Sequence, residues 1–90
     1  MGTSVLRPQE HVIFSDLDDG EGVLVDLNAK RYYTLNETAI FVWRRLEKKL
    51  SAEEIVRELA DYYDVTPERA AASVRQLLAE LSQRNLLTSA

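Results

Sequence analysis

The sequence predicts an α+β domain in which a three-stranded antiparallel sheet at the N-terminus is followed by three helices. Short β-favouring runs, separated by polar turns, occupy residues 11–35. After Leu35 the hydrophobic period changes from two to about 3.6, and three separate helix-start signals follow. In a chain of 90 residues, these elements pack most simply as one layer of helices covered by one sheet.

The predicted strands are short and are joined by turns rich in glycine, asparagine and aspartate. In the second strand the alternation puts Val23, Val25 and Leu27 on one side, as in a half-buried strand. The third strand is dense in aromatic and β-branched residues, which suit a pleated surface. The strands are expected at 11–14, 23–27 and 31–35, with a polar loop at 15–22 and a tight turn at 28–30.

Each predicted helix has a recognisable first turn. Asn36 is a good N-cap for a helix that ends near 48 or 49, with Ile40, Trp43 and Leu46 on its apolar side. The segment 51–54 fits a capping box, because serine is followed three residues later by glutamate. Thr66 and the proline after it open the third helix, and Asn85 is expected to end it in a left-handed conformation.

The predicted apolar stripes define a common core. The second helix presents Ile55, Val56, Leu59 and one of Tyr62 or Tyr63, and the third presents Ala70, Val74, Leu77, Leu78 and Leu81. Trp43 is expected to anchor the helices to the sheet through Phe14, Tyr33 and Leu35. The architecture is a winged helix-turn-helix with the wing placed first. It forms a single domain over residues 1–90, with an ordered core at about 9–87 and loose ends at 1–8 and 88–90.

Composition argues against a self-contained enzyme. The chain has no cysteine and one histidine, His11, which makes thiol chemistry, thiolate metal sites and a multi-histidine metal site improbable. The acidic loop that begins at Asp16 does not match a calcium loop, since Gly20 falls at position 5 and Leu27 at position 12. We therefore expect no catalytic residue, no cofactor and no metal. A chain without cysteine, apolar span or secretory signal fits the cytoplasm.

Nucleic-acid binding is an alternative, because a winged helix-turn-helix often reads DNA through a late helix. The basic residues of the third helix, Arg69, Arg75 and Arg84, are offset by Glu68 and Glu80. The whole chain carries a net charge of −4, whereas phosphate contacts require a basic surface. We therefore expect neither nucleic acid nor membrane as a partner, and a DNA-binding regulator is kept as a second alternative.

The third strand offers a different possibility. A three-stranded sheet has two edges, and an open edge can accept an extended peptide as a further strand. The peptide would pair with 32–35 while its side chains enter a groove floored by Ala71, Val74 and Leu78, with Arg75 on the rim. The opposite interpretation is that Lys30 and Arg31 blunt the edge and that Ala70–Ala72 only favour helix formation. The residues alone leave both open.

Several segments resemble the PqqD-like family. They are Gly-Val-Leu-Val-Asp-Leu-Asn-Ala-Lys-Arg-Tyr-Tyr-Thr-Leu-Asn-Glu-Thr-Ala at 22–39, Ser-Ala-Glu-Glu-Ile-Val-Arg-Glu-Leu-Ala-Asp-Tyr-Tyr-Asp at 51–64, and matching stretches at 72–81 and 85–87. Such proteins are RiPP recognition elements: small winged-helix domains that bind the leader of a ribosomally synthesised, post-translationally modified peptide and present it to maturation enzymes. The resemblance implies strand addition along the third strand, against the last helix.

The resemblance also implies partners and site residues. It predicts a precursor leader peptide and a maturation enzyme, such as a leader peptidase or a radical-SAM protein, as partners. Members dedicated to pyrroloquinoline quinone synthesis tend to carry a Leu-Leu-x-Pro-Glu-type second strand and an Asp-Gly turn after the first helix, both of which differ here. A lasso-peptide-type role is therefore the first choice, the quinone role an alternative, and a homodimer through paired third strands a weaker one. The predicted peptide-binding residues are Tyr32, Tyr33, Thr34, Leu35, Ala71, Val74, Arg75 and Leu78.

Overall fold

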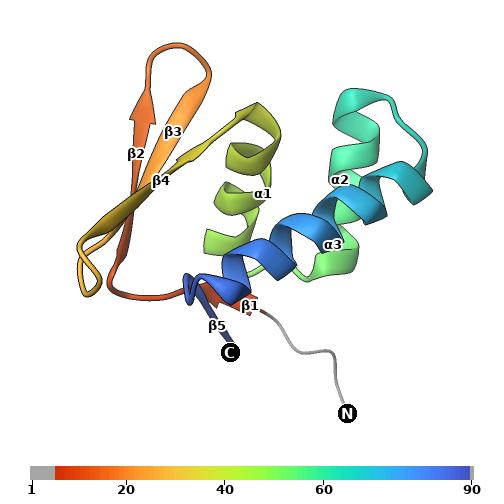
Figure 1. The fold of residues 1–90 in the computed structure, drawn as a ribbon. Coiled ribbons are helices and arrows are strands. Elements are labelled where there is room, and N and C mark those ends of the chain that lie inside the picture. The colour runs from red at the N-terminus through yellow and green to blue at the C-terminus, as the bar shows by residue number, and fades with distance from the viewer. Residues whose placement is uncertain (1–5, 90) are drawn as a thin grey trace.

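The computed structural model describes residues 6–89 and confirms the predicted fold class (Figure 1). An antiparallel sheet of three strands packs beside three helices, and a small two-stranded ribbon joins the ends of the described chain. The elements are β1 (Leu6–Pro8), β2 (Val12–Leu17), β3 (Glu21–Asp26), β4 (Arg31–Leu35), α1 (Glu37–Glu47), α2 (Ala52–Tyr63), α3 (Pro67–Gln83) and β5 (Leu87–Ser89). No helix within this part of the chain has both the length and the apolar character needed to cross a membrane.

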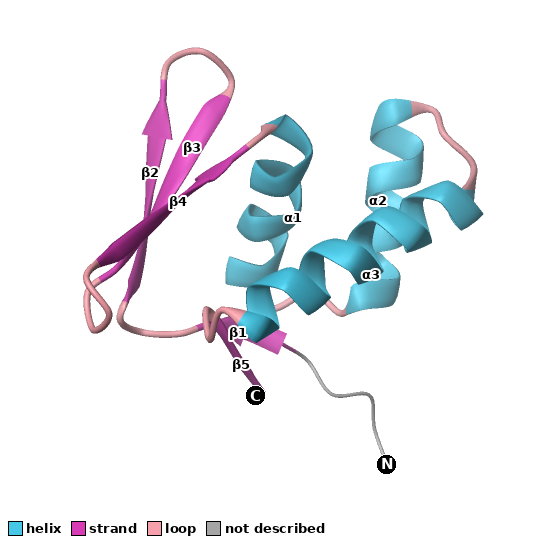
Figure 2. Cartoon of the chain, viewed as in Figure 1, coloured by secondary structure: helices cyan, strands magenta, loops and turns pink. Residues whose placement is uncertain are grey.

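The three-stranded sheet is a meander in which β3 lies between β2 and β4 (Figure 2). β2 is longer than predicted, since it continues to Leu17 through residues that the sequence placed in a loop. The turn that follows is correspondingly short, and Gly20 adopts a φ of 75°, which glycine tolerates without strain. Ser15 and Asp16 concealed this extension, because they are polar and exposed, and Asp16 forms an ion pair with Arg44.

The inward side of β3 is opposite to the one that its hydrophobic alternation suggested. Val23, Val25 and Leu27 do share a side, but this side faces away from the helices, and Leu27 is exposed. Leu24 and Asp26 are the buried residues. The Asp26 carboxylate accepts hydrogen bonds from the backbone N–H groups of residues 28 and 29, at 3.0 and 3.1 Å. Asp26 thus shapes the β3–β4 turn from a buried position. A pattern that assigns every polar residue to solvent places Asp26 on the exposed side of the strand.

The predicted helix starts are confirmed. Asn36 and Thr66 each accept a hydrogen bond from the third backbone N–H group that follows them. Ser51 and Glu54 form the complete capping box, in which each side chain accepts a hydrogen bond from the other residue's backbone N–H group. These hydrogen bonds hold the pKa of the Glu54 carboxyl below its ordinary value. Asn85 has the predicted left-handed conformation, with a φ of 59°.

The core lies between the inward side of the sheet and the three helices. Trp43 is fully buried, as predicted, and its indole N–H donates to the Glu47 carboxylate at 3.2 Å. Phe14 and Tyr33 of the sheet pack against the edge of this core. The buried apolar residues are Val12, Leu24, Leu35, Ala39, Phe41, Val42, Trp43, Leu46, Ile55, Leu59, Ala70, Val74, Leu81, Leu86 and Leu87.

The prediction of loose ends at 1–8 and 88–90 is wrong where the structure describes them. β1 and β5 pair antiparallel, with Arg7 opposite Thr88. The ribbon is continued by Gln9, whose backbone N–H donates to the Leu86 carbonyl at 3.0 Å. Strands of three residues are too short to show a period of two, so pairing between the two ends has no local signal. Residues 1–5 and 90 lie outside the described part of the chain.

Candidate functional site

The outer edge of β4 faces the C-terminal half of α3. Within residues 6–89, β4 pairs with β3 on one side only, so its other side offers backbone groups for a further strand. The helix that follows in sequence begins at Glu37 and turns the chain away from the sheet (Figure 2). The space between β4 and α3 is therefore left open.

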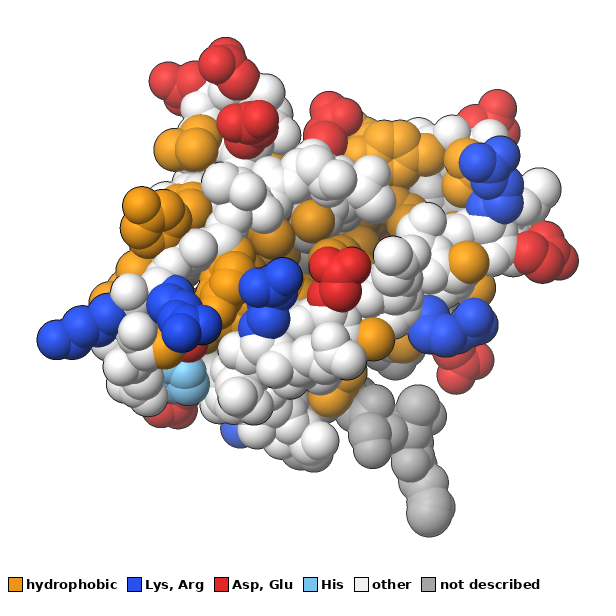
Figure 3. Space-filling model, in the orientation of Figure 1, with side chains coloured by type: hydrophobic (Ala, Val, Ile, Leu, Met, Phe, Trp, Pro, Cys, Tyr) orange, Lys and Arg blue, Asp and Glu red, His pale blue; other side chains and the backbone are white. Residues whose placement is uncertain are grey.

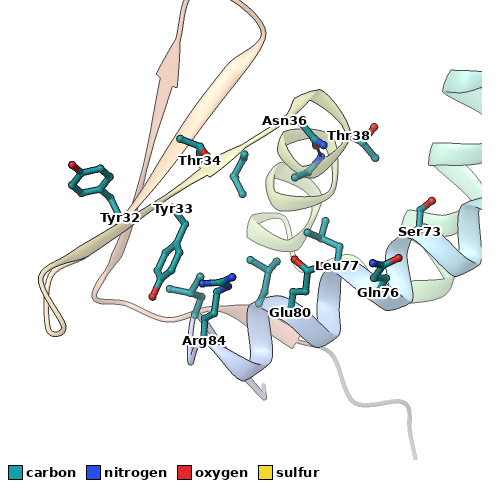
Figure 4. Close-up of a pocket in the computed structure, with 14 residues that line it drawn as sticks. Tyr32, Tyr33, Thr34, Asn36, Thr38, Ser73, Gln76, Leu77, Glu80 and Arg84 are labelled. Carbon is teal, nitrogen blue, oxygen red and sulfur yellow. Dashed lines mark hydrogen bonds between the residues drawn. The ribbon is translucent and has the colours of Figure 1, made fainter.

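This space is a groove with a volume of about 640 Å³. β4 and the start of α1 form one wall, and α3 with the turn after it forms the other (Figure 4). The lining residues are Tyr32, Tyr33, Thr34, Leu35, Asn36, Thr38, Ala39, Ser73, Gln76, Leu77, Glu80, Leu81, Arg84 and Leu86. We call it the β4–α3 groove.

The four predicted residues of the strand all line the β4–α3 groove. Leu35 is buried and Tyr33 partly buried, whereas Tyr32 and Thr34 are exposed. This alternation follows from the pleat, which sends successive side chains to opposite faces of the sheet. Of the four predicted strand residues, Tyr32 and Thr34 are thus the two with exposed side chains, and their contact with a peptide stays a prediction.

The groove combines an apolar floor with a polar rim. Leu35, Leu81 and Leu86 are buried beneath it. At the rim, the Arg84 guanidinium lies 4.8 Å from the centre of the Tyr33 ring, within the range of a cation–π contact. Glu80 and Arg84 are the charged residues of the lining. Apolar side chains, polar groups and an open strand edge together suit an extended peptide.

The predicted helix wall lies elsewhere. Val74 is only 2% exposed and belongs to the core. Together with Ala71, Arg75 and Leu78, it lines a second hollow, of about 1130 Å³, between α2 and α3. None of the four lines the β4–α3 groove. The sequence therefore placed the groove on the wrong side of α3. A contact between these four residues and a peptide stays a prediction.

The error arises from the orientation of α3 about its own axis. This helix packs against α2 with one side and faces β4 with another, so its apolar stripe is broad and does not identify which flank is open. The flank that forms the groove has a signal of its own: 73, 76, 77, 80, 81 and 84 follow helical spacing. Because most of these residues are polar, the pattern resembles an ordinary solvated side.

The family model described as "Coenzyme PQQ synthesis protein D (PqqD)" matches residues 21–87, which include β3, β4 and the three helices. The chain belongs to the PqqD family. This membership agrees with the resemblance seen in the sequence at 22–39, 51–64, 72–81 and 85–87. A comparison with curated protein sequences finds no match.

Solved structures share the PqqD-family fold of this chain. "TbiB1 in Complex with the TbiA(beta) Leader Peptide" has 27% sequence identity and a TM-score of 0.84, covering 90% of this chain and 93% of that one. "Lasso peptide synthetase B1 complexed with the leader peptide" has 23% identity and a TM-score of 0.83, covering 92% and 96%. The PqqD truncation of Methylobacterium extorquens PqqCD, described as a stand-alone RiPP recognition element, has 24% identity and a TM-score of 0.77, covering 93% and 88%.

No cluster of three or more histidine, aspartate or glutamate side chains with the geometry of a metal site occurs in residues 6–89. His11 lies beside the buried Asp26, with 3.5 Å between Nε2 and Oδ1. The histidine is therefore placed at the end of the sheet, next to the β3–β4 turn, and it is not part of the groove lining.

Proposed function

We propose that this chain is a RiPP recognition element, which binds the leader of a precursor peptide in the β4–α3 groove. The leader pairs with the open edge of β4 through its backbone, while its side chains contact Tyr32, Thr34 and the groove flank of α3. The observation that carries the proposal is the open strand edge beside a groove with an apolar floor, in a chain of the PqqD family. The 27% identical TbiB1, solved with a leader peptide, supports it.

We also propose that the chemistry belongs to a partner. The charged groups of the groove lining are Glu80 and Arg84, and the arginine is engaged with Tyr33. Such a groove can hold a peptide in an extended conformation and orient it for an enzyme that carries out the reaction. The partner would be a maturation enzyme that acts on the precursor, such as a leader peptidase in a lasso-peptide-type pathway.

The lasso-type assignment rests on the sequence departures from members dedicated to quinone synthesis. The second strand reads Val-Leu-Val-Asp-Leu at 23–27, and α1 ends at Glu47 with Lys48 and Lys49 in the turn that follows. The description of the family model favours the alternative, a peptide chaperone in pyrroloquinoline quinone synthesis. Binding to leaders from both classes of precursor, compared side by side, separates the two: the cognate leader should bind at least tenfold more tightly.

Nuclear magnetic resonance titration tests the leader-binding proposal. Addition of a synthetic leader to the ¹⁵N-labelled protein should shift the backbone amide signals of 32–36 and of 73–84. The signals of 52–61, on the α2 side of the second hollow, should stay in place. Unchanged spectra at high peptide excess, for every precursor encoded near this chain, would refute leader binding.

A further inference from the structure

The side of the sheet that faces away from the helices carries several exposed or half-exposed apolar side chains. We call it the outer face. By the strand register, Ile13 and Leu17 of β2, Val23 and Val25 of β3, and Tyr32 of β4 all point to this side. Ile13 is 49% exposed, Leu17 44% and Tyr32 74%, and Leu27, next in the alternation of β3, is 53% exposed. The same register places Ser15, Glu21 and Thr34 on this side, so small polar groups and one carboxylate lie among the apolar side chains. Half-exposed apolar side chains gathered on one side of a sheet favour contact with another molecule.

The centre of the outer face is uncharged, and one end is acidic. The cross-strand row of Ile13, Val25 and Tyr32 contains no ionisable side chain other than the tyrosine hydroxyl. Asp18, Asp19 and Glu21 form the rim at the β2–β3 turn, and all three are exposed. Figure 3 shows hydrophobic side chains along the left margin of the molecule, below a group of acidic side chains. A complementary surface would be apolar at its centre and basic where it meets the turn.

The outer face is continuous with the β4–α3 groove, because Tyr32 and Thr34 belong to both. A peptide strand added to β4 widens the sheet by about 4.8 Å and turns alternate side chains toward the outer side. A protein on the outer face would therefore contact this chain and the bound peptide together. An enzyme that recognises a leader held by its carrier can use such a composite surface.

The size of the outer face argues for a partner that extends beyond it. Three strands about 4.8 Å apart and six residues of about 3.3 Å each give roughly 300 Å². A standard interface takes about 800 Å² from each partner, so a second copy that met only this face would be held weakly. A larger protein can also cover the acidic turn and the bound peptide.

We propose that the outer face docks the maturation enzyme that acts on the bound precursor, through an apolar surface bordered by lysine or arginine side chains. This inference rests on the proposed function, since the enzyme is defined by the peptide that this chain binds. It assigns leader binding and enzyme docking to two neighbouring surfaces that share β4.

The test separates these two surfaces by substitution. Ile13→Lys places a charge in the middle of the outer face at a half-exposed position, which a folded sheet can tolerate. Tyr62→Lys is the matched control, because Tyr62 is 69% exposed on α2 and lies outside the outer face and the groove. A second variant, Asp18→Lys with Asp19→Lys, reverses the charge of the exposed turn. It leaves the strands unchanged, so its effect does not depend on whether Ile13→Lys destabilises β2.

The probes are a fluorescent synthetic leader and the purified, intact enzyme that cleaves it, encoded beside the precursor. For Ile13→Lys, leader affinity should stay within twofold of the wild type, and affinity for the enzyme should fall at least tenfold. The turn variant should weaken enzyme binding severalfold and reduce its salt dependence. Tyr62→Lys should change neither affinity.

Three results would overturn the inference. The first is unchanged enzyme affinity in both outer-face variants. The second is an equal loss in Tyr62→Lys, which would indicate general destabilisation. The third is a wild-type dimer in sedimentation velocity that Ile13→Lys dissociates, because a second copy would then cover the face. Failure of the proposed function gives a different result, namely that the wild-type protein binds no leader.

Discussion

Leu77 and Leu78 are neighbours on α3 that separate the two hollows of the molecule. Both are partly buried, and both pack against the core. Leu77 lines the β4–α3 groove, whereas Leu78 lines the hollow between α2 and α3. Replacement of each by alanine removes the same atoms from the same helix. We predict that only Leu77→Ala weakens leader binding.

The magnitude follows from the area that a peptide can still cover. Complete burial of a leucine side chain contributes about 1.5–3 kcal/mol. Because Leu77 is already partly buried in the free protein, a bound leader covers only the remaining part, and its truncation should cost about 1 kcal/mol of binding, or about fivefold in Kd. Both variants should lose about 2 kcal/mol of folding free energy, at the low end of the range for leucine-to-alanine changes in cores.

Fluorescence anisotropy with a labelled synthetic leader measures the two dissociation constants, and urea unfolding measures the two stabilities. The similar loss of stability makes Leu78→Ala a control for indirect effects on the fold. If Leu78→Ala weakened binding as much as Leu77→Ala or more, the leader would lie between α2 and α3. That outcome would refute the assignment of the β4–α3 groove and restore the sequence-based wall of Ala71, Val74 and Arg75.

Three further predictions concern the fold. Val74→Asp should unfold the domain, because an unpaired charge at a position only 2% exposed costs several kcal/mol. Circular dichroism should show no folded baseline, and a folded variant would contradict the core position of Val74. Ser51→Ala removes half of the capping box and should lower the stability by about 1 kcal/mol and Tm by about 4–8 °C, measured by calorimetry; an unchanged Tm would contradict the cap. Gly22→Ala places a Cβ 2.5 Å from the Phe14 ring and should cost about 1 kcal/mol or more in urea unfolding, a loss that Phe14→Leu should partly relieve.

The sequence placed the strand wall of the groove on residues that line it, and the helix wall on residues that line the other hollow. β4 could be located because aromatic and β-branched residues at 31–35 specify a strand, and the alternation separates Tyr32 and Thr34 from Leu35. The wall on α3 depends on which side of that helix faces α2 and which faces β4. Ala71 and Leu77 are both compatible with an apolar stripe at helical spacing, and the choice between them depends on how the helix is rotated in the folded domain.

The sequence by itself determined the features that depend on neighbours along the chain. Local hydrogen bonds and the periods of 2 and 3.6 account for the caps at Asn36, Ser51 and Thr66 and for the order of three strands and three helices. The period of 2 also accounts for the exposure of Tyr32 and Thr34 on β4. The tertiary structure decided the rest: the inward side of β3, the pairing of β1 with β5 and the rotation of α3. For each of these three features, more than one arrangement agrees with the local hydrogen-bonding and periodicity patterns. Only contacts between segments far apart in the chain, such as those that bury Leu24, Val74 and Leu86, select one of them.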